Sequence, residues 1–326
     1  MSLALMSNMK LSIIIPVYNA SGVIERTLLS IKNTISHSFE VIIVNDASTD
    51  NTLNILNTLK DKFNFLNIFS LSVNSGPGVA RDKGLEEACG DYVLFFDSDD
   101  LMLTEAVDDA IITLDEKGLD VALLPYSVDM GLGKKQGMWD RDERLFKEAR
   151  VNSGHIIKID NHPLLLTTTN YPWNKICRAK YLSSIKLSFG SLRLHEDILP
   201  HWNILMNTQE IYLSTKKICE YYIPESGKNV SNDKTSIRIQ SVDACKSLLD
   251  VIASKKEYKK FSPIGWIFSA HVLTWARDMI NQDSKAKLIK LSAEFFNECD
   301  IKDIVRIRHL DEDAFNSIYE FLIPGK

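Results

Sequence analysis

The sequence lacks the features that define disulfide-stabilised, zinc-binding and membrane-spanning proteins. Its five cysteines are scattered without a CxxC pair, which indicates reduced thiols in a cytosolic protein, mostly filling the core, rather than a disulfide framework or a zinc site. No apolar run reaches the roughly 18 residues that a membrane-spanning helix requires. The seven histidines show no HxxxH or HExxH spacing, and His195 is the one nearest a candidate site.

Other common signatures are also missing. No GxGxxG follows the first apolar run, which disfavours a dinucleotide oxidoreductase, and the absence of GKS or GKT excludes a P-loop. The net charge of −5 argues against general nucleic-acid binding. Residues 1–9 are too short and too weakly charged for a secretory signal. We interpret them as leader residues, of expression-vector or native origin, with Met6 or Met9 as alternative native starts.

The first part of the chain alternates between two patterns. Apolar, often β-branched runs predict strands at 11–19, 39–48, 66–73, 91–100 and 120–130, and segments with helical spacing follow the first four. This alternation predicts an α/β fold with a mostly parallel sheet and helices on both faces. Thr49 or Asp50 is expected to cap the second helix, and Thr104 the fourth.

The remaining chain falls into three parts. Residues 131–152 are charged, contain glycine and lack a strong period, which predicts a loop or a mobile connection. Apolar segments resume at about 171–223, and four helical segments follow from about residue 228. At 326 residues the chain is long enough for a catalytic domain at 10–226 and a C-terminal helical subdomain at 227–326.

The segment 255–275 in the tail has two interpretations. It places a basic run before an aromatic-rich helical segment, KKEYKKFSPIGWIFSAHVLTW. Such a segment either lies on an anionic membrane surface, as a peripheral contact, or forms a core helix that packs on the catalytic domain.

Polar clusters follow three of the predicted strands, namely PVYN, NDASTD and DSDD. Because ligands bind at the carboxyl ends of parallel strands, these clusters are expected to meet in one crevice. Asp97 and Asp99 in the third cluster are spaced to share one oxygen-ligated Mg²⁺ or Mn²⁺ ion. The alternative is a solvated loop whose aspartate caps the next helix.

Of three further candidates, two have alternatives of the same kind. Asp46 can accept hydrogen bonds from a base or ribose, or belong to a helix-capping turn. Arg81 follows Gly76-Pro77-Gly78, which would place a cation near phosphates at a helix start. Glu196 and Asp197 offer a proton acceptor, or are acids of a helix N-terminal turn.

Taken together and in this order, the motifs resemble those of the family 2 glycosyltransferases, which have the GT-A fold. The family pattern runs from P-x-Y-N through DD/ND-x-S-x-D, A-R-N-x-G and D-x-D-D to an E-D pair. The matching residues are Pro16-Val17-Tyr18-Asn19, Asn45-Asp46-Ala47-Ser48-Thr49-Asp50, Ala80-Arg81-Asp82-Lys83-Gly84, Asp97-Ser98-Asp99-Asp100 and Glu196-Asp197. Trp173-Asn174-Lys175 also resembles the W-N-K segment of many capsule and cell-wall members. Each motif alone is weak, but the ordered set, from about Leu11 to Ile223, is highly specific.

The resemblance implies a cytoplasmic, inverting enzyme that is either free in the cytoplasm or peripheral at the inner face of the membrane. It would transfer a hexosyl or N-acetylhexosaminyl group from a nucleotide donor, usually UDP-linked, with Mn²⁺ or Mg²⁺, to a glycan or lipid-linked acceptor in bacterial surface-polysaccharide synthesis. The implied nucleotide-sugar pocket contains Pro16, Tyr18, Asn19, Asp46, Ser48, Arg81 and Asp97. Asp99, with Asp97, would bind the metal; Asp197, beside Glu196, would be the base; Trp173 and Lys175 would lie on the sugar or acceptor side.

The sequence departs from the family pattern at two places. Asp82 stands where the family often has Asn, and the segment 221–233 lacks the Tyr-Arg and His that often close over the diphosphate. We expect Lys228 to supply that charge instead.

Two other functions remain open at this point. A GT-A-like nucleotidyltransferase would usually have a Gly-rich phosphate loop after the first strand, which PVYNAS does not provide. A non-catalytic sugar-nucleotide-binding or scaffold protein is disfavoured by the presence of Asp99 and Asp197.

Overall fold

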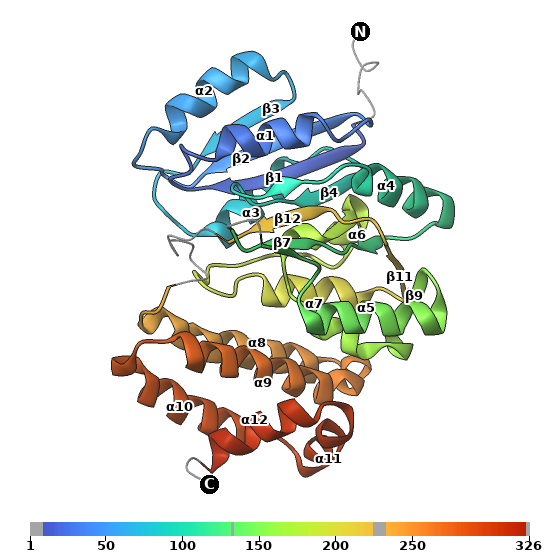
Figure 1. Ribbon diagram of the computed structural model, residues 1–326, viewed down its shortest axis with the longest axis vertical. Helices are drawn as coiled ribbons and strands as arrows, with labels where there is room; N and C mark the ends of the chain where they lie inside the picture. Colours follow the sequence, from blue (N-terminus) through green and yellow to red (C-terminus); the bar gives the residue numbers. More distant parts are fainter. Residues whose placement is uncertain (1–8, 132–133, 224–232, 324–326) are drawn as a thin grey trace.

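The computed structural model of the chain describes residues 9–131, 134–223 and 233–323. Within this part, an eight-stranded mixed sheet has the strand order β3-β2-β1-β4-β10-β6-β11-β9 (Figure 1). Its strands are β1 (Leu11–Val17), β2 (Phe39–Asn45), β3 (Leu66–Ser70), β4 (Tyr92–Phe95), β6 (Val121–Leu123), β9 (Ile156–Lys158), β10 (Lys175–Arg178) and β11 (Glu210–Leu213).

The N-terminal half of this sheet has the predicted strand–helix alternation. The central strand β1 pairs in parallel with β2 and β4, and the helices between the strands are α1 (Ile24–Lys32), α2 (Thr52–Lys62) and α3 (Pro77–Glu87), followed by α4 (Ala106–Lys117). Gly84 shows how closely α3 packs on β1, since a Cβ atom there would lie 2.3 Å from Ile14 Cγ2. The predicted α/β fold is therefore confirmed.

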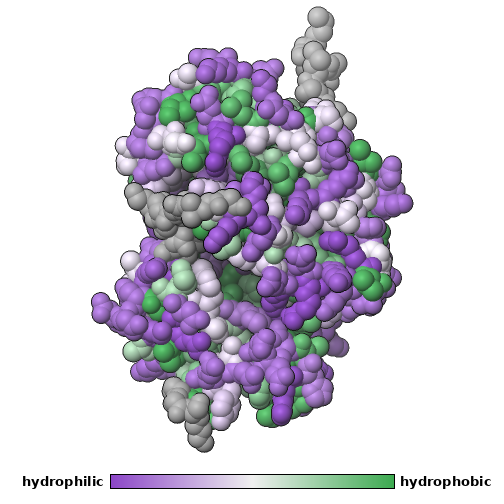
Figure 2. All heavy atoms as spheres, viewed as in Figure 1, coloured by the Kyte–Doolittle hydropathy of each residue, from purple (hydrophilic) through white to green (hydrophobic). Residues whose placement is uncertain are grey.

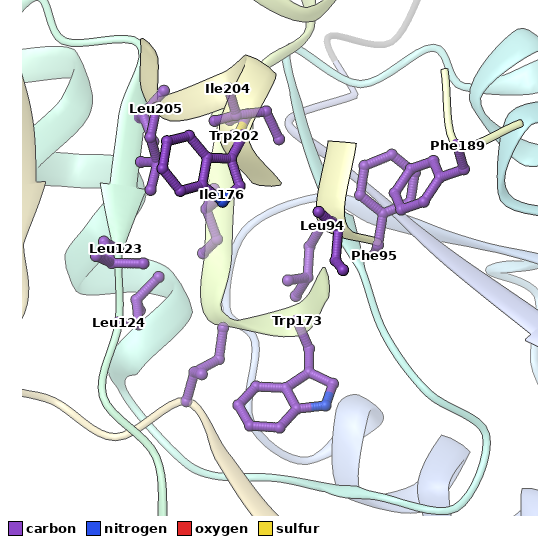
Figure 3. Packing of buried hydrophobic residues seen from close by; sticks show 14 of the residues in the cluster. Leu94, Phe95, Leu123, Leu124, Trp173, Ile176, Phe189, Trp202, Ile204 and Leu205 are labelled. Carbon is purple, nitrogen blue, oxygen red and sulfur yellow. The ribbon is translucent and has the colours of Figure 1, made fainter. Parts of the chain in front are cut away.

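The other half of the sheet contains antiparallel pairs. Strand β10 runs antiparallel to both β4 and β6, and β9 runs antiparallel to β11. Figure 3 shows side chains of β4, β6 and β10 packed around Ile176, with Trp202 of α7 (Ile198–Asn207) on one side. Phe95 meets Phe189 edge-on with their ring centroids 4.7 Å apart, which fixes the chain before α7 to the end of β4.

The strand predicted at 120–130 is wrong, because this segment is divided between two sheets. Its first part is β6, and its second part is β7 (Ser127–Asp129) in a small sheet of order β5-β12-β7-β8. The other strands there are β5 (Leu101–Met102), β8 (Lys135–Gln136) and β12 (Cys219–Tyr222). The division falls at Pro125, whose ring nitrogen cannot donate to a strand ladder.

The loop predicted at 131–152 is also wrong, since the segment contains β8 and the helix α5 (Asp140–Ser153). The buried residues of α5 are Asp142, Leu145, Phe146 and Ala149, at helical spacing. This apolar face is narrow, and the surrounding charged residues obscured its period in the sequence.

Two predicted helix caps are wrong as well. The N-cap of α2 is Asn51 rather than Thr49 or Asp50, although Asp50 Oδ1 does accept a hydrogen bond from the backbone of Thr52 at 3.0 Å. The N-cap of α4 is Glu105, at a φ of 68°, rather than Thr104.

The C-terminal part is helical, as predicted, and lies below the sheet in Figure 1. It contains α8 (Gln240–Ser254), α9 (Ser262–Met279), α10 (Gln282–Phe296) and α12 (Glu312–Leu322), and also α11 (Ile301–Leu310), which was not predicted. Most apolar side chains of α9 are buried, with Trp266 packed on Phe295, so α9 is a core helix, although Trp275 is 39% exposed. Within the described ranges, no helix combines the length and apolar character needed to cross a membrane. Figure 2 shows hydrophilic residues spread over the described surface in this view, with hydrophobic residues scattered among them.

All five cysteines have free thiols, as the spacing predicted. Cys177, Cys219 and Cys245 are buried and serve as small core residues, whereas Cys89 is exposed. A short helix, α6 (Ala179–Ser184), follows β10.

Candidate active site

The loops after β1 and β2 are joined by hydrogen bonds. Asn19, at a φ of 50°, accepts a hydrogen bond at Oδ1 from the backbone of Thr49 at 2.8 Å. Its own backbone N–H donates to Ser48 Oγ at 3.0 Å. Tyr18 is 49% exposed beside this contact, and Pro16 lies within β1 just before it. The first two polar clusters thus meet at one sheet edge, with an aromatic ring presented to solvent.

Asp46, at the end of β2, is buried and supports the next loop. Its Oδ1 accepts a hydrogen bond from the backbone of Ser75 at 2.7 Å, and its Oδ2 accepts one from Gly76 at 2.8 Å. Gly76 has a φ of 94°, which favours glycine. Asp46 therefore fixes the entry into α3, while each oxygen retains a lone pair for a ligand.

The third cluster, DSDD, is held against α1. Arg26 donates from Nη2 to the carbonyl oxygen of Asp99 at 2.9 Å, and Thr27 donates from Oγ1 to that of Ser98 at 2.9 Å. DSDD therefore lies against the start of α1, and its meeting with the first two polar clusters in one crevice stays a prediction. No local pattern indicates the Arg26 and Thr27 contacts, because they join positions more than 70 residues apart.

Arg81 of α3 connects the DSDD cluster after β4 with the E-D pair. Its Nη2 donates to Asp97 Oδ1 at 2.8 Å and its Nη1 to Glu196 Oε1 at 2.6 Å. Burial disfavours the charged guanidinium, but the two carboxylates outweigh that effect and raise the pKa of Arg81. Arg81 is thus a buried, doubly paired cation at the centre of the site.

The carboxylates after β4 are buried and repel one another. Burial, and next the charge of Asp97, raise the pKa of Asp99 to about 6. Burial, and then Asp99 and Asp97, raise the pKa of Asp100 well above its usual value. A cation at this position would relieve the repulsion, and hard carboxylate oxygens are the ligands that Mg²⁺ and Mn²⁺ prefer.

These residues fit a cation that shares its ligands with substrate. In the described part of the chain, no group of three or more His, Cys, Asp or Glu residues could hold a metal by itself. Asp97 also gives one oxygen to Arg81. Asp97 and Asp99 therefore offer a partial ligand set, which matches a Mg²⁺ or Mn²⁺ site completed by diphosphate and water.

Asp197 stands at the N-cap position of α7, immediately after Glu196. Its side chain makes no capping hydrogen bond to the described backbone of α7, so the carboxylate is not used to stabilise that helix. Burial, and next the charge of Glu196, raise the pKa of Asp197 to about 7, against the opposing effects of Arg81 and Lys175. A carboxylate that titrates near neutrality is suited to general base catalysis.

His195 contributes no charge to this pair at neutral pH. Burial, and next the charge of Arg238, lower the pKa of His195 to about 4. Its ring meets Trp275 of α9 with centroids 5.9 Å apart, so the chain just before the E-D pair is packed on the C-terminal helices.

Trp173 and Lys175 lie beneath the site rather than on its solvent-facing wall. Trp173 is fully buried and stacks on Tyr171 with ring centroids 4.5 Å apart. Lys175 is 3% exposed. The prediction that they contact the sugar or acceptor stays a prediction, and Lys228, proposed for the diphosphate, lies outside the described residues.

Asp82, noted above only as a departure from the family pattern, anchors the chain that leads to the E-D pair. Its Oδ1 accepts a hydrogen bond from the backbone of Phe189 at 2.7 Å. Its Oδ2 accepts from Ser188 Oγ at 2.7 Å and from the backbone of Gly190 at 3.1 Å. A carboxylate can accept all three bonds, whereas an Asn side chain has only one acceptor oxygen.

Solved structures that resemble this chain show its fold class. The crystal structure of residues 1–349 of Staphylococcus aureus TarS in complex with UDP superposes with a TM-score of 0.72 at 23% identity, covering 96% of this chain and 90% of that one. A mannosyltransferase, PcManGT from Pyrobaculum calidifontis, in complex with GDP-Man and Mn²⁺, gives a TM-score of 0.55 at 15% identity, with coverages of 97% and 88%. These similarities show the fold, which is the GT-A type with a C-terminal helical region.

The family follows from the sequence comparisons. The family model described as glycosyl transferase family 2 matches residues 12–182, more than half of the chain. The chain belongs to this family.

Curated relatives include two enzymes of known name. The poly(ribitol-phosphate) beta-N-acetylglucosaminyltransferase TarS of Staphylococcus aureus strain Mu50 is 32% identical over 69% of this chain and 37% of its own length. The poly(ribitol-phosphate) beta-glucosyltransferase of Bacillus spizizenii is 31% identical over 68% of this chain and 34% of its own length. The chain therefore spans about a third of the length of these relatives.

Proposed function

We propose that this chain catalyses inverting transfer of a sugar from a nucleotide donor, UDP-linked by preference, to a glycan or lipid-linked acceptor in cell-surface polysaccharide synthesis. The observation that carries the proposal is the double pairing of Arg81 with Asp97 and Glu196. It joins the expected donor side of the site to the carboxylate pair that contains the expected base. A non-catalytic binding protein would not require this connection.

In this proposal Asp197 accepts the proton of the acceptor hydroxyl. The acceptor oxygen bonds to the anomeric carbon while the bond from that carbon to the diphosphate breaks, so the configuration inverts in one step. The elevated pKa of Asp197, about 7, increases its basicity relative to an ordinary carboxylate. Glu196, held by Arg81, keeps the adjoining chain in place.

On the donor side, Tyr18, Asn19, Ser48 and Asp46 would bind the nucleoside, with Pro16 shaping β1 beneath them. The exposed Tyr18 ring supports this role because a flat aromatic surface can stack on a base. Asp97 and Asp99 would hold Mg²⁺ or Mn²⁺, which offsets the negative charge of a diphosphate leaving group. Lys228 would add a cation to the same group.

The relatives support a polymer acceptor more than a particular sugar. The names of the Staphylococcus and Bacillus enzymes share poly(ribitol-phosphate) as acceptor but specify N-acetylglucosaminyl and glucosyl transfer, respectively. We therefore propose a hexosyl or N-acetylhexosaminyl donor and an acceptor of the surface-polymer class. Residues 10–226 would form the catalytic unit and 227–326 the helical unit, in a protein that acts in the cytoplasm.

The test is a panel of UDP- and GDP-linked sugars, with hydrolysis of the donor measured in the presence of Mn²⁺ and then of excess chelator. We expect turnover of at least one UDP-sugar, loss of that turnover with chelator, and loss of transfer in Asp197→Asn with donor binding retained. Asp243→Asn, on α8, is the control for loss of a carboxylate outside the site. Donor binding without turnover of any sugar by the unaltered chain would contradict the enzymatic proposal.

A further inference from the structure

Lys175 is a buried cation beneath the proposed base, and the reaction described above gives it no role. It begins β10, directly after the short 3₁₀ turn Pro172–Asn174, and only 3% of its surface is exposed. Burying a lysine ammonium costs free energy unless hydrogen bonds and an opposite charge compensate it. The groups around Lys175 therefore indicate how its charge is stabilised.

Three acceptors surround the Lys175 ammonium. Nζ donates to the carbonyl oxygen of Tyr171 at 2.8 Å, to Asn174 Oδ1, and to His201 Nδ1 at 3.0 Å. The other ring nitrogen of His201 lies 3.2 Å from the carbonyl oxygen of Leu166, which requires a proton on Nε2 and leaves Nδ1 as an acceptor. All three N–H groups of the ammonium are thus satisfied by neutral partners.

The neutral form of His201 is favoured by its position. Burial, and next the charge of Lys175, lower the pKa of His201 well below its usual value. A neutral His201 can therefore accept from Lys175 over the whole range in which the protein is expected to work. Tyr171, Asn174 and His201 together supply the hydrogen-bond acceptors that a charged Lys175 requires.

Lys175 and Asp197 face the same small cavity. Both residues line it together with His201 and with apolar side chains such as Phe95, Phe189 and Ile204. Because the lining is largely apolar, the charge of Lys175 is poorly screened at Asp197. The proximity also fits the mutual influence of the two groups on each other's titration.

We propose that Lys175, held by His201 and Asn174, is a positioning residue that keeps Asp197 ionised through its buried charge. This inference deepens the proposed function and rests on it for the assignment of Asp197 as the base. Lys175 touches neither donor nor acceptor in this proposal. Its effect is to oppose the burial and the Glu196 charge that favour the protonated, inactive form of Asp197.

Charged and titratable groups on several elements surround Lys175 and Asp197. Asp197 faces Glu196 beside it, Arg81 on α3 and Lys175 on β10. Lys175 is influenced by Cys177 on its own strand, Asp197 before α7 and Asp142 on α5. Burial lowers the pKa of Lys175 to about 7 against these charges, so Lys175 and Asp197 titrate in the same pH range as one coupled pair.

A double-mutant cycle of urea unfolding tests the coupling without any measurement of turnover. The variants are Lys175→Met, Asp197→Asn and the double variant, at pH 7 and pH 5. At pH 7, where both groups are partly charged, we expect Asp197→Asn to raise the unfolding midpoint more in the Lys175→Met background than in the unaltered chain. At pH 5, where Asp197 is protonated, the two shifts should be equal. Equal shifts at pH 7 would overturn the inference.

Two controls separate charge from packing. Lys180→Met removes an exposed lysine five positions away and should show no coupling with Asp197→Asn. If Lys175→Met does not fold, His201→Leu replaces it in the cycle, because loss of one acceptor disfavours the charged lysine. His201→Asn, which keeps an acceptor near the position of Nδ1, should restore the unaltered behaviour; failure of His201→Leu to couple would likewise contradict the inference.

The second readout is the pH profile of kcat/KM with the donor found in the panel described above. In Lys175→Met we expect the acid limb to move up by about one pH unit, so that activity falls about tenfold at pH 6 and little at pH 9. A uniform loss at every pH would mean that Lys175 is only structural. Coupling in the unfolding cycle without turnover of any donor would sustain the Lys175–Asp197 interaction and overturn the proposed function instead.

Discussion

Arg81 and Glu196 are 115 positions apart in the chain, yet Nη1 of one donates to Oε1 of the other at 2.6 Å. The same guanidinium holds Asp97 at 2.8 Å, so one side chain from α3 aligns the end of β4 with the start of α7. Because the guanidinium is buried, these bonds are weakly screened.

Replacing Arg81 by Met should remove both bonds and leave Asp97 and Glu196 without their cation. We expect the free energy of unfolding to fall by about 3 kcal/mol, because breaking a buried ion pair leaves an uncompensated charge. Urea denaturation followed by circular dichroism measures this. Lys83→Met, which removes a half-buried partner of Glu87 on the same helix, should cost much less, because such an ion pair is largely screened by solvent. Equal losses in both variants would contradict the central role of Arg81.

Replacing Asp82 by Asn should loosen the chain at 188–190. The variant keeps the shape but has one acceptor oxygen where three hydrogen bonds arrive, so we expect a loss of about 1–2 kcal/mol in unfolding free energy. The measurement is the thermal or urea midpoint, with Asp61→Asn on the exposed face of α2 as the matched control. If Asp82→Asn were as stable as the unaltered chain, the anchoring role would be wrong.

Replacing Asp99 by Ala should weaken Mn²⁺ binding in the presence of UDP by at least tenfold, because half of the proposed protein ligand set is removed. Calorimetric titration of Mn²⁺ into the UDP-saturated protein measures this directly. Asp91→Asn, at the opposite end of the same strand, should bind Mn²⁺ normally. Unchanged affinity in Asp99→Ala would exclude this residue as a ligand.

Activity should rise with pH through about 7 and then level off, since Asp197 acts as a base only when ionised and its pKa is raised to about 7. The same shift predicts a stability effect of opposite sign. An elevated folded-state pKa means that the folded protein loses stability as the pH rises from the unfolded value of about 4 to about 7. Asp197→Asn should therefore be more stable than the unaltered chain at pH 8 and equally stable at pH 3.5. Thermal midpoints at the two pH values check this, and a midpoint difference that does not change with pH would contradict it.

Local sequence predicted the strands and helices of the first half well. Short apolar runs such as 11–17 and 39–45 favour strands buried on both faces, because they are rich in β-branched residues and too short for a buried helix. Prediction failed where apolar periodicity was diluted by charge, as in α5, or interrupted by proline, as between β6 and β7. At these places contacts made elsewhere in the chain decide the local conformation.

The sequence by itself determined the residue types of the candidate site and the order in which they occur. The motifs from Pro16 to Asp197 are visible in the chain because most of them lie at the end of a strand or near the start of a helix, and the family membership agrees with them. Carboxylates after an apolar strand favour a ligand with positive charge, since the cluster is otherwise repulsive, but the sequence leaves a solvated loop as the alternative.

Only the tertiary structure decided which of these groups form ion pairs or lie close enough to interact electrostatically. Whether Arg81 pairs with Asp97 and Glu196, whether Asp82 holds 188–190, and whether Lys175 lies beneath Asp197 depend on how α3, β10 and α7 pack. Side-chain charges interact strongly only across a few ångströms of poorly screened interior. That proximity arises between segments distant in the chain, so no local pattern contains it.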